Sequence, residues 1–148
     1  AVVRDGGSSH CIARQEGTYP VQILVIQVGT RQPLGVGASG LALLSALTDR
    51  EVEAISDINA PALAIYGGMT QERLRLLVAA TRERGWAVVG NHATKGVLAV
   101  GMPVYSSAGD VLAGISVATT EDRMTRTRQR EIAQVMRKAL RAHGFEAH

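Results

Sequence analysis

The sequence predicts an α+β domain in which an antiparallel sheet is covered by helices. Strand-like runs occupy the first third of the chain and return after residue 85, and helical patterns lie between and after them. Neighbouring strand-like runs are joined by short glycine-containing turns, which are typical of hairpins rather than of parallel units. At 148 residues the chain is expected to fold as one domain, residues 1–148.

The first third is predicted to form three strands. Residues 1–4 and 9–15 flank an Asp-Gly-Gly turn, which favours a hairpin. The β-branched run at residues 21–28 lacks polar alternation, so we expect both of its faces to be covered. Gly29 ends this third strand.

Two helices are predicted to follow. The first begins at Gly37 or Ser39 and continues through Leu47 as an almost wholly apolar run. Thr48 is a plausible N-cap for a second, short helix that ends near Ile55.

Residues 56–68 are expected to be irregular, because Pro61 lies within them and two glycines end them. Thr70 then caps a clearer helix over Gln71–Arg84, and Gly85 stands at its C′ position.

The second group of strands is predicted at residues 86–89, 96–105 and 111–118. The last two form a hairpin. Gly101 and Gly114 leave room beside the backbone of these strands for another element to approach.

Thr125 is predicted to cap a last helix, Arg126–Ala142, whose apolar positions recur with helical spacing. The chain has a net charge of +3. From Arg123 to the end there are seven basic and two acidic residues, so this part has a net charge of +5 and the preceding part has −2. Such a helix can contact nucleic acid, but a basic run is more often a solvated surface. The chain has one Trp, three Tyr and one Phe, which are too few aromatic residues for a base-stacking surface.

Composition excludes several classes. No apolar stretch has the length of a membrane span, and the first residues do not resemble a signal peptide. The single cysteine, Cys11, excludes an internal disulfide and a cysteine-rich zinc site, and it favours a reducing, cytoplasmic setting. We expect Cys11 to be a small core side chain. The chain begins without methionine, and we expect it to be a domain of a longer protein.

No cluster of catalytic groups is evident. The histidines lack the spacing of a metal site, no phosphate-binding lysine motif occurs, and a redox activity would need a second cysteine. The glycines at 35–40 match a dinucleotide pattern only in letters, because helices follow them where a βαβ unit is needed. The sequence therefore predicts a binding domain with no catalytic residues, metal or cofactor.

The stretch from Pro33 to Gly40 is the candidate binding element. Small residues leave the backbone N–H groups of Ala38 and Ser39 accessible at a helix start, where they and the helix dipole favour a carboxylate or phosphate. Tight packing of the same small residues against the sheet explains the pattern equally well.

Four blocks of sequence, in order, carry a resemblance to a known family. They are the Arg-Gln-Glu-Gly run at 14–17, residues 28–34 with the Ala-Ser-Gly at 38–40, the Arg-Gly-Trp-Ala-Val run at 84–88, and a discontinuous block from Lys95 to Thr125. With these blocks the chain resembles the C-terminal effector-binding domain of IclR-type bacterial transcriptional regulators.

The resemblance implies a GAF-like fold: a central antiparallel sheet of about six strands with helices on both faces. It also implies homodimers or homotetramers, a small-molecule carboxylate effector, and DNA contact only through an N-terminal winged helix-turn-helix domain absent from this chain. The effector-binding residues that it implies are Gly37, Ala38, Ser39, Val89, Asn91, Val97, Ala99, Ser116 and Ala118.

Several departures from the family pattern remove polar groups, at Gly35, Leu41, Val89, Ala99 and Ala118. Because burying unpaired hydroxyl groups costs a few kcal/mol each, such a lining favours an acid with an apolar body over a sugar acid. The alternative is an oligomerisation module whose pocket has degenerated and has no physiological effector.

Overall fold

The computed structural model describes residues 1–19, 26–90 and 95–148, and within these ranges the chain forms six strands and four α-helices. The strands are β1 (Val2–Asp5), β2 (Ser8–Cys11), β3 (Arg31–Pro33), β4 (Ala87–Gly90), β5 (Val97–Tyr105) and β6 (Val111–Thr120). The helices are α1 (Ala38–Ser45), α2 (Asp49–Leu63), α3 (Gln71–Arg84) and α4 (Arg126–Ala142), with the short 3-10 helix η1 (Glu121–Arg123) between β6 and α4.

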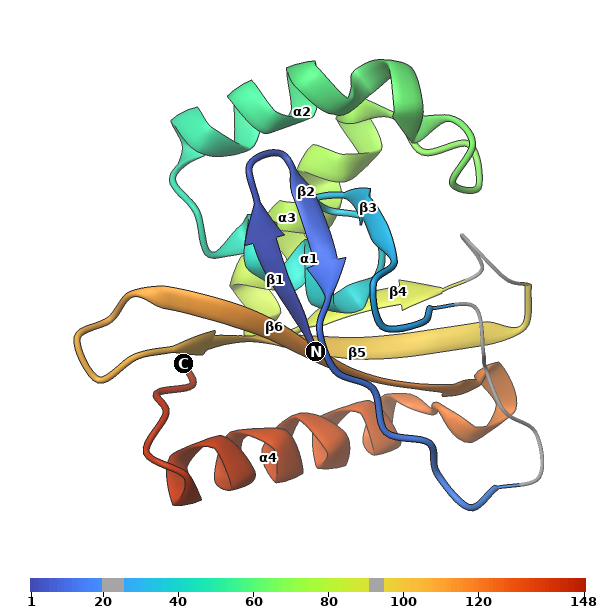
Figure 1. Ribbon diagram of the computed structural model, residues 1–148. Coiled ribbons are helices and arrows are strands. Elements are labelled where there is room, and N and C mark those ends of the chain that lie inside the picture. The colour runs from blue at the N-terminus through green and yellow to red at the C-terminus, as the bar shows by residue number, and fades with distance from the viewer. Residues whose placement is uncertain (20–25, 91–94) are drawn as a thin grey trace.

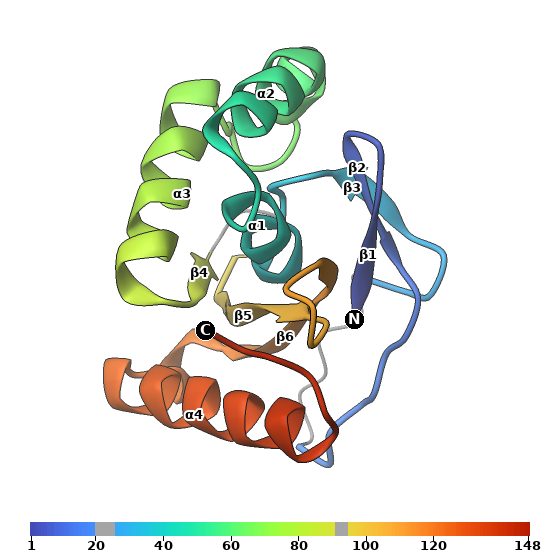
Figure 2. The ribbon, with the colours of Figure 1, turned by 90° about the vertical axis from the view of Figure 1, so that its left-hand side faces the viewer.

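The strands form a single antiparallel sheet in the order β3-β2-β1-β6-β5-β4. Figure 1 shows α1, α2 and α3 on one side of strands β4 to β6, and α4 on the other. Figure 2 shows the same layers from the side, with α1 directly against the sheet, α3 beside β4, and α2 farther from the sheet. The predicted α+β class, with an antiparallel sheet and helices on both faces, is therefore confirmed.

The sheet consists of two hairpin systems that meet at one point. Within the described residues, β1 pairs with β6 only through Val2 and Gly114. β5 and β6 pair along their whole length, and β4 continues this system at the edge. The edge of β6 beyond Gly114 is therefore not covered by β1.

The third predicted strand differs from the one observed. Residues 20–25 lie outside the described part of the chain, and Ile26 to Val28 are not in a strand. The third strand of the sheet is instead β3, which pairs with β2 through Ser8–Pro33, Ser9–Gln32 and His10–Arg31. Its proline suits an edge strand, where a backbone N–H on the outer side needs no partner. Because the strand is short and polar, its sequence shows no alternation of apolar and polar residues that would predict it.

The second strand also ends earlier than predicted, at Cys11, because the chain leaves the sheet there. Helix α2, in contrast, continues past Ile55 to Leu63. The prediction that residues 56–68 are irregular is therefore wrong for residues 56–63. Pro61 lies inside this helix. Burial of Ile55 and Leu63 stabilises these turns and offsets the hydrogen bond that the proline removes.

The predicted N-caps at Thr48, Thr70 and Thr125 are confirmed. Each threonine hydroxyl accepts a hydrogen bond from the backbone N–H three residues later. At Thr48 the Glu51 side chain also accepts from the threonine backbone, which completes a capping box. The Thr48 backbone N–H, the Thr48 hydroxyl and the Arg4 guanidinium all donate hydrogen bonds to this carboxylate, and they hold the pKa of Glu51 below its usual value. Gly85 ends α3 in the left-handed conformation, as predicted.

Helix α1 lies in the centre of the main core. Seven of its eight residues are buried, and Leu41, Ala42 and Leu44 are fully so. It packs against β5 and β6 on one side and against α3 on the other. Cys11 is buried in the same core, as predicted. The far face of the sheet packs through Val100 and Met102 against α4.

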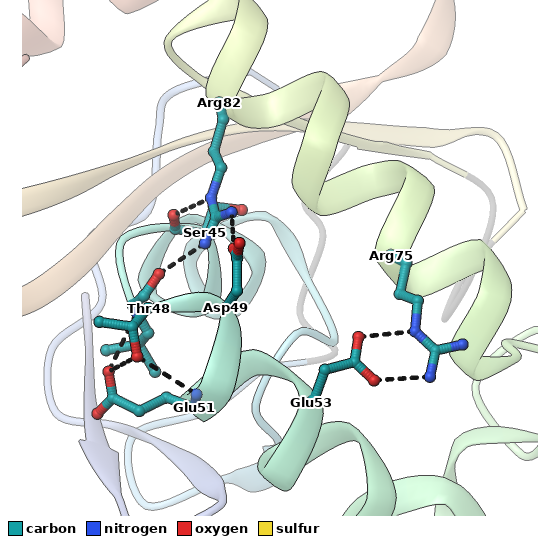
Figure 3. A network of polar contacts seen from close by, with 8 residues as sticks. Ser45, Thr48, Asp49, Glu51, Glu53, Arg75 and Arg82 are labelled. Atoms are coloured by element: carbon teal, nitrogen blue, oxygen red, sulfur yellow. Dashed lines mark hydrogen bonds and ion pairs between the residues drawn. The ribbon is translucent and has the colours of Figure 1, made fainter.

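An arginine of α3 holds the C-terminal end of α1. Helix α1 has no basic residue in its own last turn. Arg82 donates from Nε to the Ser45 carbonyl at 2.9 Å and from Nη2 to the Leu47 carbonyl at 2.6 Å, and it also pairs with Asp49 (Figure 3). A guanidinium at this position satisfies terminal carbonyls and opposes the negative end of the helix dipole. Arg82 thus connects α1, α2 and α3.

We expect Arg82→Gln to lower the free energy of unfolding by about 1–3 kcal/mol, because it removes charge-assisted hydrogen bonds to backbone carbonyls that then lack a partner. Chemical denaturation of the 148-residue chain measures this loss.

Arg75→Gln is the matched control. Arg75 lies on the same helix and pairs with Glu53 through two hydrogen bonds, but both side chains are half exposed and neither holds α1 (Figure 3). It should cost clearly less stability than Arg82→Gln, since exposed ion pairs contribute little. Equal losses would contradict a special role for Arg82.

Candidate functional site

A cavity of about 520 Å³ begins between the sheet and the first turn of α1 and continues past the edge of β6 to Val117, Thr119 and Ile132, on the face that carries α4. Its floor is set by strand register. Val89 of β4 lies opposite Ala99 of β5, and Ala99 lies opposite Ala118 of β6. Since alternate residues share one face of a strand, Val97 and Ser116 belong to the same face. All five side chains line the cavity, so most of its floor is apolar.

The first turn of α1 forms the roof. Gly37 is the N-cap, with a φ of 74°, and among the described residues no side chain caps this end. Gly37, Ala38 and Ser39 line the cavity. The first N–H groups of a helix have no intrahelical partner, so this end presents donors and partial positive charge. Ser39 lies within the helix, so of the two predicted starts, Gly37 and Ser39, the first is the N-cap.

The position of this turn depends on two glycines of the sheet. A Cβ atom at Gly101 would lie 2.5 Å from the carbonyl carbon of Ala38, and one at Gly114 would lie 3.0 Å from that of Ser39. Both distances are too short for a side chain. The room that the sequence predicted beside Gly101 and Gly114 is therefore filled by α1.

The structure brings eight of the nine expected effector-site residues to this cavity. The ninth, Asn91, lies outside the described residues. Gly35 and Leu41, two of the positions at which the sequence lacks an expected polar side chain, are not in the lining. Leu41 is fully buried, and a Cβ at Gly35 would meet Leu74 and Leu44. These two positions belong to the core and do not alter the polarity of the cavity.

Sequence reasoning missed a polar wall. Residues 13–19 run along the cavity after β2 and contribute Arg14, Gln15 and Glu16, while Gln32 enters from β3. Arg123 and Arg128, from η1 and the start of α4, also line it. Arg14 and Arg123 fall in the blocks that carry the family resemblance, which was the available signal for them.

The charges of this wall are partly matched. Arg14 Nη2 lies 3.4 Å from Glu16 Oε1, and Arg128 Nη1 lies 2.9 Å from Glu131 Oε2. Arg123 instead lies over the ring of Tyr19, with its guanidinium carbon 3.7 Å from the ring centroid. Cations in this arrangement are attracted to the negative face of the ring.

The described residues contain no group of three or more His, Cys, Asp or Glu side chains placed to hold a metal ion. None of the helices in these residues is long and apolar enough to cross a membrane.

Comparison with known proteins identifies the class of protein as transcriptional regulators. The C-terminal domain of the bacterial transcriptional regulator IclR matches residues 2–143. The HTH-type transcriptional regulator KipR of Bacillus subtilis (strain 168) is 32% identical over 130 residues, which cover 86% of this chain and 51% of KipR. The Pca regulon regulatory protein of Pseudomonas putida is 30% identical over 119 residues, 78% of this chain and 40% of that protein.

The fold agrees. The crystal structure of Thermotoga maritima IclR superposes with a TM-score of 0.81 at 24% identity, over 93% of this chain and 56% of that one. The chain therefore belongs to the IclR family of bacterial transcriptional regulators and corresponds to its C-terminal regulatory domain. The family and these relatives are regulators rather than enzymes, in agreement with the sequence-based prediction. The chain spans 51% and 40% of the length of the two relatives, about half or less.

We expect Gly101→Ala to destabilise the domain by about 1–3 kcal/mol, because the added methyl group overlaps the backbone of α1 and forces the helix away from the sheet. Thermal or denaturant unfolding measures the loss.

Gly40→Ala adds the same methyl group within α1 itself. Its Cβ would meet only ordinary contacts, at 3.5 Å from the Gly35 nitrogen and the Ser9 hydroxyl. Because alanine favours helix over glycine, this variant should be neutral or slightly stabilising. A large loss in both variants would mean that tight packing of the whole helix, rather than its contact with Gly101, is responsible.

Proposed function

We propose that the cavity beneath α1 binds a small carboxylate with an apolar body, and that this effector alters DNA binding by the complete regulator. The observation that carries the proposal is the convergence of a helix start without a side-chain cap and an apolar floor on one cavity of about 520 Å³. That volume is in the range of small-molecule sites. Regulators of this family bind small-molecule effectors and DNA.

The two ends of the effector would meet different surroundings. Backbone N–H groups at Ala38 and Ser39 would bind the carboxylate, because they are hydrogen-bond donors at a helix start that no side chain caps. Val89, Ala99 and Ala118 would contact the apolar body. Burial of apolar surface against this row favours association, and a ligand with many hydroxyl groups would leave several of them without partners there.

The remaining parts of the proposal concern the complete protein. We infer that it acts in the cytoplasm as a homodimer or homotetramer and contacts its operator through a separate N-terminal winged helix-turn-helix domain. The length of the relatives, about twice that of this chain, supports a further domain. An effector that binds one subunit arrangement more tightly than another would shift DNA affinity by that difference.

Thermal unfolding with a panel of carboxylates tests effector binding. We expect an aromatic or aliphatic acid to raise the melting temperature in a concentration-dependent way, since a ligand of the folded state stabilises it. Sugar acids of similar size should have a smaller effect. Stabilisation by sugar acids alone would contradict the apolar-body proposal, and no stabilisation by any acid would favour the oligomerisation module.

An electrophoretic mobility shift with the 148-residue chain tests where operator contact arises. We expect no sequence-specific retention of a DNA fragment from the regulated promoter, because sequence is read by elements that enter the grooves of DNA and the proposal assigns these to another domain. The complete regulator is the positive control. Specific retention by this chain alone would contradict the proposal.

A further inference from the structure

We propose that Arg123, positioned by Tyr19, binds a second anionic group of the effector at the rim of the cavity. The ligand class would then be an elongated acid with an anionic group at each end and an apolar body between them. This inference rests on the proposed function, because it concerns the same cavity.

The contact with Tyr19 is close enough for the ring to cover one face of the Arg123 guanidinium. The guanidinium carbon lies 3.7 Å from the centroid of the Tyr19 ring, so the planar group uses one face for this contact. The N–H donors of a guanidinium point outward in its plane and match a carboxylate with two parallel hydrogen bonds. A ring that holds the face of the group therefore orients it without using these donors.

The charge balance singles out the same residue. Three arginines line the cavity, and two of them have a carboxylate nearby: Arg14 has Glu16, and Arg128 has Glu131. In the part of the chain that the structure describes, Arg123 forms no ion pair. Its neighbours Glu121 and Asp122 are exposed and are not in the cavity lining. Arg123 is thus the cavity cation whose charge an anionic ligand would complement.

The two anion-binding ends are separated along β6. Gly114 lies beneath Ser39 at the start of α1, whereas η1 and Arg123 follow the end of the strand at Thr120. Ala38 lies over Gly101, which pairs with Ser116, so about four to six residues of β6 separate the two ends, ~13–20 Å at ~3.3 Å per residue. The reach of an arginine side chain shortens this separation, and a ligand with an anionic group at each end would span what is left. Along this stretch Ser116 and Ala118 line the cavity on the α1 face of β6, and Val117 and Thr119 line it on the α4 face.

Calorimetric titration of the 148-residue chain tests the inference with matched acids. The pairs are hexanoate and adipate, octanoate and suberate, decanoate and sebacate, and para-toluate and terephthalate. In at least one pair we expect the dicarboxylate to bind about 10-fold or more tightly than the monocarboxylate, the size expected for a hydrogen bond between charged groups.

Arg123→Gln should remove this advantage, so that in this variant no dicarboxylate binds more tightly than its matched monocarboxylate. Arg126→Gln is the matched control, because Arg126 is a nearby exposed arginine that does not line the cavity, and it should retain the full advantage. Tyr19→Phe keeps the aromatic face and should retain most of the advantage, whereas Tyr19→Leu should reduce it further. Unchanged melting temperatures would show that each variant remains folded.

The outcomes separate this inference from the proposed function. If monocarboxylates bind and no dicarboxylate binds more tightly than its partner, the second anionic group is excluded while the proposed function stands. An advantage that survives Arg123→Gln overturns the role of Arg123. If no acid of either kind binds, both the inference and the proposed function fail.

Discussion

The first turn of α1 lies so close to the sheet that neither Gly101 nor Gly114 has room for a side chain. This contact places the start of the helix above a row of small residues and leaves a cavity beside it instead of a filled core. The orientation of the helix matters as much as its distance, because its N-terminal end, with partial positive charge, faces the cavity. Larger residues at these two positions would move the donors and the floor apart.

So short a helix is not stable by itself, since isolated helices need about 12–15 residues to form in water. Helix α1 is therefore held by its surroundings: buried leucines fix its sides, the glycines admit its first turn, and Arg82 binds the carbonyls at its end. Because Arg82 belongs to α3 and also pairs with Asp49 of α2, the position of the cavity roof depends on the outer helical layer (Figure 3).

Local patterns predicted the capped helices α3 and α4 and the long hairpin of β5 and β6, because caps and strand alternation are properties of neighbouring residues. They failed where distant parts of the chain decide the outcome. Strand β3 depends on pairing with β2, and the later turns of α2 depend on burial that compensates for Pro61. The cavity floor was predicted through the family resemblance, but its polar wall was not, since Arg14 and Arg123 meet there only in the folded chain.

The cavity combines positions that differ in how freely they can change. Gly101 and Gly114 accept no substitution without displacing α1, so they define the architecture and offer no means of adjusting what is bound. Ala99 and Ala118 carry small side chains that face open space, and Arg123 and Tyr19 lie at the rim, outside the packed core. If the cavity binds an effector as proposed, substitutions at the floor and the rim change ligand preference without endangering the fold, and protein engineers can begin a redesign of specificity at the same positions.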